Sequence, residues 1–411
     1  MSERQWKVID VVKRVESGLL TSRQGAQIAG VSTRQFLRIR GRVAVEGKKA
    51  VVHGNRGRAP SNKLSDEKRA KVVELRRTKY IGFNDQHFTE KLAVAEAIAT
   101  SCSTVRRLLR KEGIGAEQKR RARKHRRRRE RKAQEGLMLL WDGSRHDWLE
   151  GRGSWLCLVG AIDDATGQVM PGAHFGQQET SEAYLRTLRA IVLEKGVPFS
   201  IYQDRHSALQ RNDENWTLEE ELRGKQDPTQ VGRAMVALGI EAIYALSPQA
   251  KGRVERLWKT FQDRLCSELR LAGATTMVEA NEVLQRFVTD FNRRFAVEAK
   301  DSEPAWRRLK VDADEACSFM YEATVGNDNA VRLEGEVIDI PPGPKGRSYA
   351  RARVQVRQML DASWRIHHRG ALIATKAASP LAELRPRARK KRSAASRAFR
   401  KGILQVAVSL P

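Results

Sequence analysis

Three apolar runs decide the fold of the central part of the chain: MLLWDGS at 138–144, SWLCLVGAIDD at 154–164 and GQVMPGAHF at 167–175. Short turn signals separate the runs, and such a series predicts a β-meander in which consecutive strands pair. Asp163 and Asp164 fall in the second of these turns. Because an Asp-Ala-Thr-Gly stretch between apolar runs is typical of a hairpin, we interpret both as turn residues and not as metal ligands.

Helical and strand-like segments alternate after the meander. A helix is predicted over 180–196, a strand over 199–204, a polar insertion near 210–230, and a helix near 231–238 before the apolar stretch 240–246. Long helices are expected to follow, from about 250 to 298. This alternation predicts an α/β domain.

The N-terminal residues predict a helix-turn-helix unit, with helical segments around the turn that starts at Gly30. Thr21 and Ser32 are suitable N-caps. The expected small core consists of Ala26, Ile28, Val31, Phe36 and Leu37. The side chains expected to face outward, toward DNA, are those of Arg34, Arg38 and Arg40. An ordinary helical hairpin with solvated arginines has the same pattern, and the sequence leaves that alternative open.

A second unit of this kind is predicted between a polar link at 53–63 and Glu112. Ser65 is expected to cap its first helix, and Ser103 the helix STVRRLLRKEGI. In that helix Val105, Leu108 and Leu109 are expected to pack inward. Arg106, Arg107 and Arg110 are then left to meet phosphates or bases.

Positive charge dominates the composition. The 411 residues carry a formal net charge of +28, and eleven of the fourteen residues from Lys119 to Lys132 are Lys or Arg. A surface of this kind attracts a polyanion, and counterion release favours nucleic acid as the partner. The basic run is therefore predicted to be a linker that follows DNA, although a nuclear-localisation signal has the same composition.

Cysteine spacing and hydropathy indicate an intracellular chain. Four cysteines stand far apart, without a CxxC pair or a histidine at zinc-finger spacing. No apolar run approaches the length of a membrane span, and the N-terminus lacks the apolar centre of a signal peptide. We expect a cytoplasmic, nucleoid-associated protein with no membrane partner.

Alternating apolar residues between about 325 and 376 predict a small antiparallel β-barrel, and a basic tail follows it. The fold class is therefore multidomain: all-α helix-turn-helix units, then the α/β domain, then the small β-barrel.

Three acidic residues are predicted to converge within the α/β domain. Asp142 ends the first strand of the meander, Asp204 ends the strand 199–204, and Glu255 lies early in a helix. The apolar stripe of that helix includes Val254, and Glu255 lies about 100° from Val254, so it borders the buried face. Lys251 and Lys259 lie one turn before and after Glu255 and are expected to hold DNA phosphates, as is Arg253.

Phosphodiester cleavage needs an activated nucleophile and a stabilised leaving oxygen, which two Mg²⁺ ions provide. Carboxylate oxygens are the ligands that such hard cations prefer. Without an ion, three neighbouring carboxylates would repel one another. The residues alone leave open that these are three unrelated surface groups.

The local sequences resemble the DDE transposases with a retroviral-integrase-type core, and are most similar to the ISNCY group of insertion-sequence transposases. The matching stretches are WDGSRHDW, IYQDRHSAL, SPQAKGRVERLW and FNRRFAVE. The resemblance implies an RNase H-like core, with Asp142, Asp204 and Glu255 as catalytic residues that bind two Mg²⁺ ions, for which Mn²⁺ can substitute. It also implies that several copies of the chain assemble on double-stranded DNA, at the element ends and the target.

The chain departs from the integrase pattern at two points. Asp204 and Glu255 are 51 positions apart, which is longer than in retroviral integrases. Arg205, His206 and Ser207 follow the second aspartate, where many relatives have Asn-Gly-Ser. His206 is expected to contact DNA or a metal-bound water, or to make a structural hydrogen bond.

The predicted function is a transposase that binds the ends of a mobile element and catalyses metal-dependent strand cleavage and strand transfer. The alternative is a DNA-binding regulator with an inactive integrase-like core, and a nuclease that cuts without joining is a third reading. The predicted boundaries are 1–58 and 62–115 for the helix-turn-helix units, 116–133 for the basic linker, 134–310 for the catalytic core, 322–378 for the β-barrel and 385–411 for the basic tail.

Overall fold

The computed structural model describes residues 1–52, 64–117, 129–211, 214, 216–244, 252–333 and 335–378. Two compact units are present, Met1–Lys71 and Val72–Pro411. The basic tail at 385–411 and most of the basic run lie outside the described residues. Among the described helices, none is long and apolar enough to cross a bilayer.

The first unit contains three helices, α1 (Glu3–Glu16), α2 (Ser22–Ala29) and α3 (Thr33–Glu46), followed by a short 3-10 helix, Gly47–Val51. The N-caps are those predicted: Thr21 accepts a hydrogen bond from the Gln24 amide, and Ser32 from the Gln35 amide. The α2–α3 turn follows Gly30, whose φ of 66° is a left-handed conformation that glycine adopts without strain.

The core of this unit differs in part from the prediction. Ala26 and Phe36 are buried, but Ile28 and Leu37 are each 43% exposed. Ala29 and Ile39 fill the core in their place, because the buried stripe of α3 runs through Phe36 and Ile39.

The second unit begins within α4 (Asp66–Arg77) and continues with α5 (Asp85–Val94) and α6 (Cys102–Lys111). Ser65 accepts a hydrogen bond from the Lys68 amide, as predicted. The N-cap of α6 is Ser101 and not Ser103, so this helix starts two residues earlier than expected. Val105, Leu108 and Leu109 are buried, as predicted.

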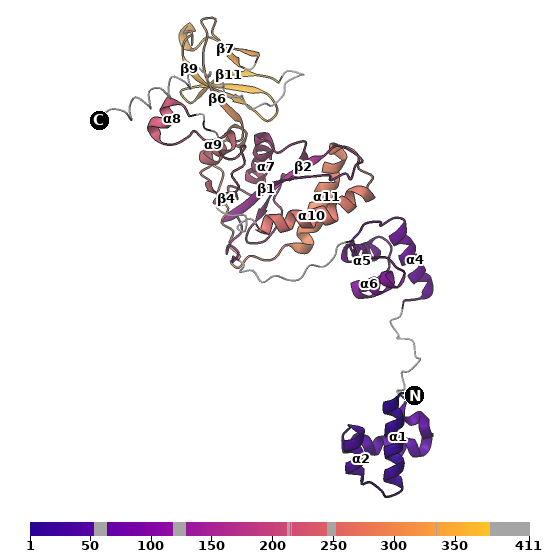
Figure 1. Cartoon of the computed structure of the whole chain (residues 1–411). Helices are drawn as coiled ribbons and strands as arrows, with labels where there is room; N and C mark the ends of the chain where they lie inside the picture. The colour runs from indigo at the N-terminus through magenta and orange to yellow at the C-terminus, as the bar shows by residue number, and fades with distance from the viewer. Residues whose placement is uncertain are drawn as a thin grey trace, which may run out of the picture. The chain divides into compact units, whose positions relative to one another are not determined.

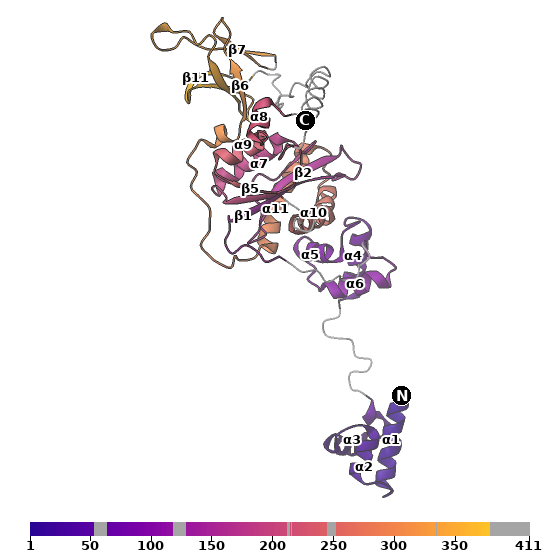
Figure 2. The same cartoon turned by 60° about the vertical axis from the view of Figure 1, so that its left-hand side comes forward.

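The α5 helix packs against the α/β core, on α10 (Gly252–Leu271) (Figures 1 and 2). Glu268 of α10 accepts a 2.7 Å hydrogen bond from Lys91 and lies 2.6 Å from Nε2 of His87. Arg264 donates to Glu90 at 2.6 Å. Charged pairs therefore hold this helical unit to the core.

The core is built on a five-stranded mixed sheet with the order β3-β2-β1-β4-β5. Its strands are β1 (Met138–His146), β2 (Leu156–Asp163), β3 (His174–Gly176), β4 (Ser200–Gln203) and β5 (Glu241–Tyr244). The first three pair antiparallel and form the predicted meander, whereas β4 and β5 add in parallel. The central α/β domain is thereby confirmed.

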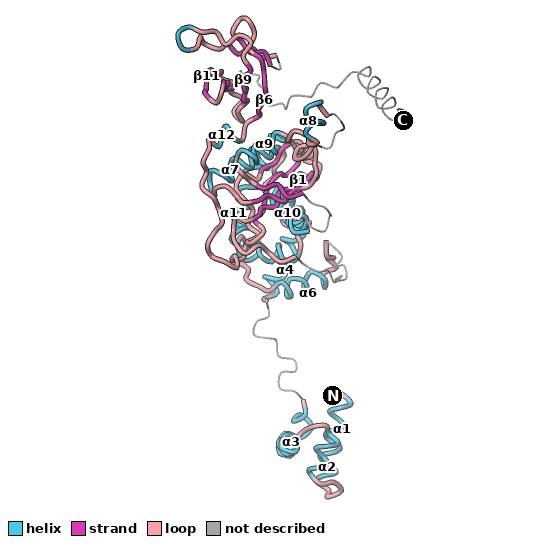
Figure 3. The backbone as a smooth tube through the Cα atoms, turned by 90° about the vertical axis from the view of Figure 1, so that its left-hand side faces the viewer, coloured by secondary structure: helices cyan, strands magenta, loops and turns pink. Residues whose placement is uncertain are grey.

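Helices cover both faces of this sheet (Figure 3). The helices α7 (Ser181–Glu194) and α9 (Gln230–Ala237) pack on one face with Leu139 and Trp141. On the other face α10 and α11 (Met277–Phe295) pack with Met138 and Leu140. The polar insertion contains the short helix α8 (Leu218–Arg223).

The predicted closed C-terminal β-barrel is not shown among the described residues. After α12 (Ala313–Ala316), the described residues form an open four-stranded antiparallel sheet of order β11-β10-β9-β6 and a separate β7–β8 ribbon. The strands are β6 (Phe319–Thr324), β7 (Ala330–Leu333), β8 (Glu336–Asp339), β9 (Arg353–Gln358), β10 (Trp364–His368) and β11 (Ala371–Lys376). Alternation identifies half-buried strands, but it does not determine whether the two edge strands pair to close a barrel.

Alanine substitutions at two glycines of the first unit are expected to change its stability in opposite directions. A Cβ on Gly25 would lie 2.7 Å from Cζ of Phe36 and 2.8 Å from Cγ2 of Val15, whereas a Cβ on Gly41 meets nothing within 4 Å. We expect Gly25→Ala to destabilise this unit by about 1–3 kcal/mol through overpacking. Gly41→Ala, in an exposed helix interior, should stabilise it by about 0.5–1 kcal/mol. Urea denaturation followed by hydrogen exchange of α2 and α3 measures both, and equal effects would contradict this packing.

Candidate active site

The pairing of β1 with β4 brings two of the three predicted acids together. The two strands are parallel, with Leu140 opposite Tyr202. If this register is extended by two residues beyond its last pair, it aligns Asp142 with Asp204, which directly follows β4. Leu140 and Tyr202 pack in the cluster that contains α10. Because side chains alternate along a strand, the two aspartates project from that same face.

Neighbouring contacts fix this register. The indole of Trp141 donates a 2.9 Å hydrogen bond to the side-chain oxygen of Gln203, and both side chains are fully buried. The His206 amide donates at 3.0 Å to Oδ1 of Asp204, which orients that carboxylate. Asp142 does not end its strand as predicted, because β1 stays paired with β2 as far as His146.

Helix α10 lies against β1 on the face of the two aspartates. Gln262 donates to the hydroxyl of Ser144 at 3.3 Å. A Cβ on Gly160, the partner of Asp142 in β2, would lie 3.3 Å from the Trp258 ring. The residues of the predicted apolar stripe are all buried: Val254, Leu257, Trp258, Phe261 and Leu265.

The structure places Glu255 in the first turn of α10, where its side chain is exposed. Seven residues separate it from Gln262, so both lie on one face of the helix, two turns apart. Glu255 therefore projects from the same face of α10 that contacts β1 two turns later, at Gln262. Residues 245–251, which precede this turn, lie outside the described residues.

A carboxylate near the aspartates that the sequence did not predict lies at Gly143, on the α7 face of β1. Glu179 accepts a 2.6 Å hydrogen bond from the hydroxyl of Tyr184, and Nδ1 of His206 lies 3.4 Å from the same oxygen. Its carboxylate also lies so close to Gly143 that a Cβ added there would clash with it. A glutamate directly before the N-cap Thr180 belongs to no catalytic motif, so only the packing reveals it.

The pKa values of two buried groups show that negative charge gathers here. Burial raises the pKa of Tyr184 well above its usual value, and the charges of Glu179, Asp142 and Asp204 raise it further. Burial, Glu179 and Asp142 likewise raise the pKa of Cys157 to about 12.

The fit to a metal ion is partial in the described part of the chain. Asp142 on β1 and Asp204 directly after β4 carry the oxygen donors that a hard divalent cation prefers. No group of three or more His, Cys, Asp or Glu side chains is arranged to hold a metal among the described residues. The predicted third ligand, Glu255, is exposed and follows a segment that is not described.

The predicted DNA-binding residues differ in their surroundings. Arg34, Arg38, Arg107 and Lys259 are exposed, and Lys251 lies outside the described residues. Others already bind within the chain. Arg40 donates to Ser22 at 3.1 Å, and Arg106 and Arg110 both donate to the carboxylate of Asp85. Arg253 forms an ion pair with Asp164.

Both aspartates lie at the turn after β2, as predicted: Asp163 is the last residue of β2 and Asp164 is the first residue of the turn. The carboxylate of Asp163 accepts hydrogen bonds from the amide and hydroxyl of Thr166, at 2.8 and 2.9 Å, and from the Gly136 amide at 3.0 Å. These are turn-forming contacts. Asp164 is also fully buried, but its carboxylate binds arginines from two other segments.

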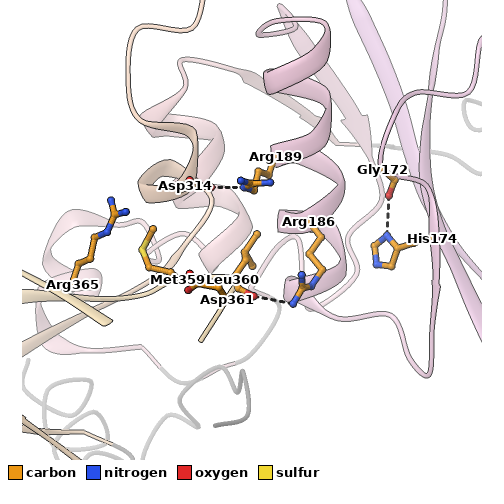
Figure 4. A pocket seen from close by; sticks show the side chains of 9 residues that line it. All are labelled: Gly172, His174, Arg186, Arg189, Asp314, Met359, Leu360, Asp361 and Arg365. Atoms are coloured by element: carbon orange, nitrogen blue, oxygen red, sulfur yellow. Dashed lines mark hydrogen bonds and ion pairs between the residues drawn. The ribbon is translucent and has the colours of Figure 1, made fainter. Parts of the chain in front are cut away.

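A cleft between α7 and the C-terminal sheet also contains arginines (Figure 4). Arg186 donates to the Leu360 carbonyl at 2.9 Å, and Arg189 pairs with Asp314. Because these contacts join α7 to the segment that carries the sheet, we assign the two arginines to packing and not to a ligand.

Comparison with known proteins identifies the family. A family described as winged helix-turn helix matches residues 8–70. The putative transposase y4bF of Sinorhizobium fredii is 32% identical over 375 residues, covering 89% of this chain and 80% of the relative. The transposase for insertion sequence IS1202 of Streptococcus pneumoniae is 31% identical over 327 residues, covering 71% of this chain and 68% of that protein.

Solved structures that match part of the chain include two of retroviral integrases. The HTLV-2 integrase catalytic core domain in complex with magnesium matches 41% of this chain and 94% of its own, at 18% identity and a TM-score of 0.28. The simian T-cell lymphotropic virus intasome in complex with PP2A regulatory subunit B56 gamma matches 75% of this chain and 99% of its own, at 13% identity and a TM-score of 0.31. On the sequence relationship to y4bF and the IS1202 protein, the chain belongs to the transposases, and its function is DNA transposition.

Proposed function

We propose that this transposase cuts and joins DNA at Asp142, Asp204 and Glu255, which hold two Mg²⁺ ions for which Mn²⁺ can substitute. The observation that carries the proposal is the β1–β4 register, which sets the two aspartates side by side on the face covered by α10. When bound, such ions activate the attacking oxygen and stabilise the leaving oxygen of a phosphodiester.

The chain's own residues position these groups. The His206 amide orients Asp204, and the Trp141–Gln203 hydrogen bond fixes the ends of the two strands. In this proposal α10 carries Glu255 on the same helix face as Gln262, which contacts Ser144 of β1. The nucleophiles are water in the cleavage step and the freed 3′-hydroxyl in the joining step, so no covalent protein intermediate is required.

The helical units recognise the element ends in this proposal. Exposed cations that can meet phosphate or base edges lie on α3 (Arg34 and Arg38), on α6 (Arg107) and on α10 (Lys259). Several copies of the chain hold the two ends and the target together, in the cytoplasm and at the nucleoid.

The exposure of Glu255 favours one alternative, a DNA-binding regulator whose integrase-like core is inactive. Such a protein would bind the ends with the same helices and would need no third metal ligand. Metal-dependent cleavage separates the two functions.

We expect Glu255→Gln to lower cleavage and joining of a labelled duplex carrying the element ends by more than about 100-fold, because a metal ligand is lost. DNA affinity, measured by fluorescence anisotropy, should be unchanged. Glu282→Gln, at an exposed position on α11, is the matched control. Equal cleavage by both variants would contradict the role of Glu255, whereas cleavage by neither variant nor the parent chain under any metal would support the regulator.

Gly143→Ala tests the packing around the aspartates. The new methyl group would enter the space of the Glu179 carboxylate and displace it or the strand that carries Asp142. A shift of about 1 Å at a catalytic group costs up to about 100-fold in rate, so we expect cleavage to fall by at least about tenfold. Gly176→Ala is the control, since a Cβ there lies 3.5 Å from its nearest neighbour. Equal rates for the two variants would show that Glu179 does not fix the site.

Arg38→Gln tests the N-terminal reading unit. A phosphate contact contributes about 0.9 to the slope of log affinity against log salt concentration. We expect this variant to weaken binding to all duplexes and to reduce that slope by about one. Binding titrations at salt concentrations from about 50 to about 200 mM measure this slope. An unchanged slope would place Arg38 away from the DNA backbone.

A further inference from the structure

The buried carboxylate of Asp164 joins two segments that are far apart in the sequence. Its Oδ1 accepts hydrogen bonds from Arg129 at 2.5 Å and from Arg253, and its Oδ2 accepts one from the Lys132 amide at 2.8 Å. Asp163 already makes the hydrogen bonds that form the turn. Asp164 is therefore not needed for the turn itself.

The two partner segments are the end of the basic run and the first turn of α10. Arg253 also donates to the Arg129 carbonyl at 2.5 Å, so the two segments touch each other as well as the carboxylate. Arg131 donates to the Ala165 carbonyl at 3.0 Å and holds the basic run to the turn. Three segments thus meet at one fully buried charge.

Burial makes this charge a strong constraint. A carboxylate removed from water is stable only when it is paired and hydrogen-bonded. The side chain of Asp164 has no exposed surface, whereas 17% of Arg253 and 45% of Arg129 remain exposed. Arg129 and Arg253 therefore reach inward to the carboxylate. These ion pairs restrain the main chain at both arginines.

The restraint acts on the turn that carries Glu255. Arg253 and Glu255 flank Val254, each about 100° from it around the helix axis. Val254 is fully buried. Once Arg253 is fixed on one side of the buried stripe, the rotation of this turn, and with it the direction of Glu255, is fixed too.

We propose that Asp164 is a positioning residue that couples the end of the basic run to the first turn of α10 and so sets the orientation of Glu255. The proposal rests on the function proposed above for Glu255. A contact of the basic run with DNA is transmitted through Arg129 and Asp164 to the active site.

Hydrogen exchange of the full chain tests the coupling without relying on catalysis. The amides of residues 256–259 are the first that donate within α10, since the first four of a helix have no partner inside it. We expect Asp164→Asn to speed their exchange by at least about tenfold, because the turn loses its restraint. Asp163→Asn is the control, because it weakens the turn but leaves both arginines paired.

Arg129→Gln is the sharpest variant, because it changes only the basic run. We expect faster exchange at 256–259 in this variant as well, and unchanged exchange in β1 and β2. Combining it with Asp164→Asn should add little, since the two act on one contact. Unchanged exchange at 256–259 in Arg129→Gln would overturn the coupling, as would equal exchange in Asp164→Asn and Asp163→Asn. If Asp164→Asn does not fold, Arg253→Gln replaces it.

The Mn²⁺ concentration for half-maximal cleavage tests whether the contacts of Asp164 with Arg129 and Arg253 affect the active site. We expect it to rise by about tenfold in Asp164→Asn, because Glu255 is less well placed as a ligand. If exchange changes while this concentration does not, the link to Glu255 is overturned. If Glu255→Gln cleaves normally, the proposed function fails, and the exchange experiment still decides whether Asp164 couples the two segments.

Discussion

The parallel pairing of β1 with β4 is the constraint on which the site depends. It joins a strand of the meander to a strand that arrives after α7, and its register, extended by two residues, aligns Asp142 with Asp204. A slip of one residue would turn one aspartate to the α7 face. The buried hydrogen bond from Trp141 to Gln203, one residue before the aspartates, penalises such a slip, since it would leave both polar groups buried without their partner.

The gathered charge then explains the surroundings of the aspartates. The charges of Glu179, Asp142 and Asp204 all raise the pKa of the Tyr184 phenol. Hydrogen bonds from Tyr184 to Glu179 and from the His206 amide to Asp204 stabilise two of these carboxylates. Under the proposed function, metal binding and fold stability are linked, since a ligand that binds only the folded state stabilises it.

The sequence predicted those parts that depend on local patterns. The N-caps Thr21 and Ser32, the meander and the buried stripe of α10 follow from spacing and capping chemistry, and the structure has them. Three features depend on pairing or contacts between distant segments and were not predictable. They are the open edge of the C-terminal sheet, the carboxylate of Glu179 beside Gly143, and the ion pairs of Asp164. Asp164 shows the limit most clearly, because its turn was predicted correctly while its partners lie 35 and 89 positions away.

Cleavage of the polypeptide by bound iron tests the central claim most directly, because it needs no knowledge of the element ends. Fe²⁺ takes the place of Mg²⁺, and ascorbate and peroxide then generate radicals that cut the backbone next to the ion. The account predicts cuts near residues 142–144, 204–206 and 252–256, all suppressed by excess Mg²⁺ and absent in Asp142→Asn. Cuts confined to other segments, or cuts at these three segments that Mg²⁺ does not suppress, would contradict a shared metal site of Asp142, Asp204 and Glu255.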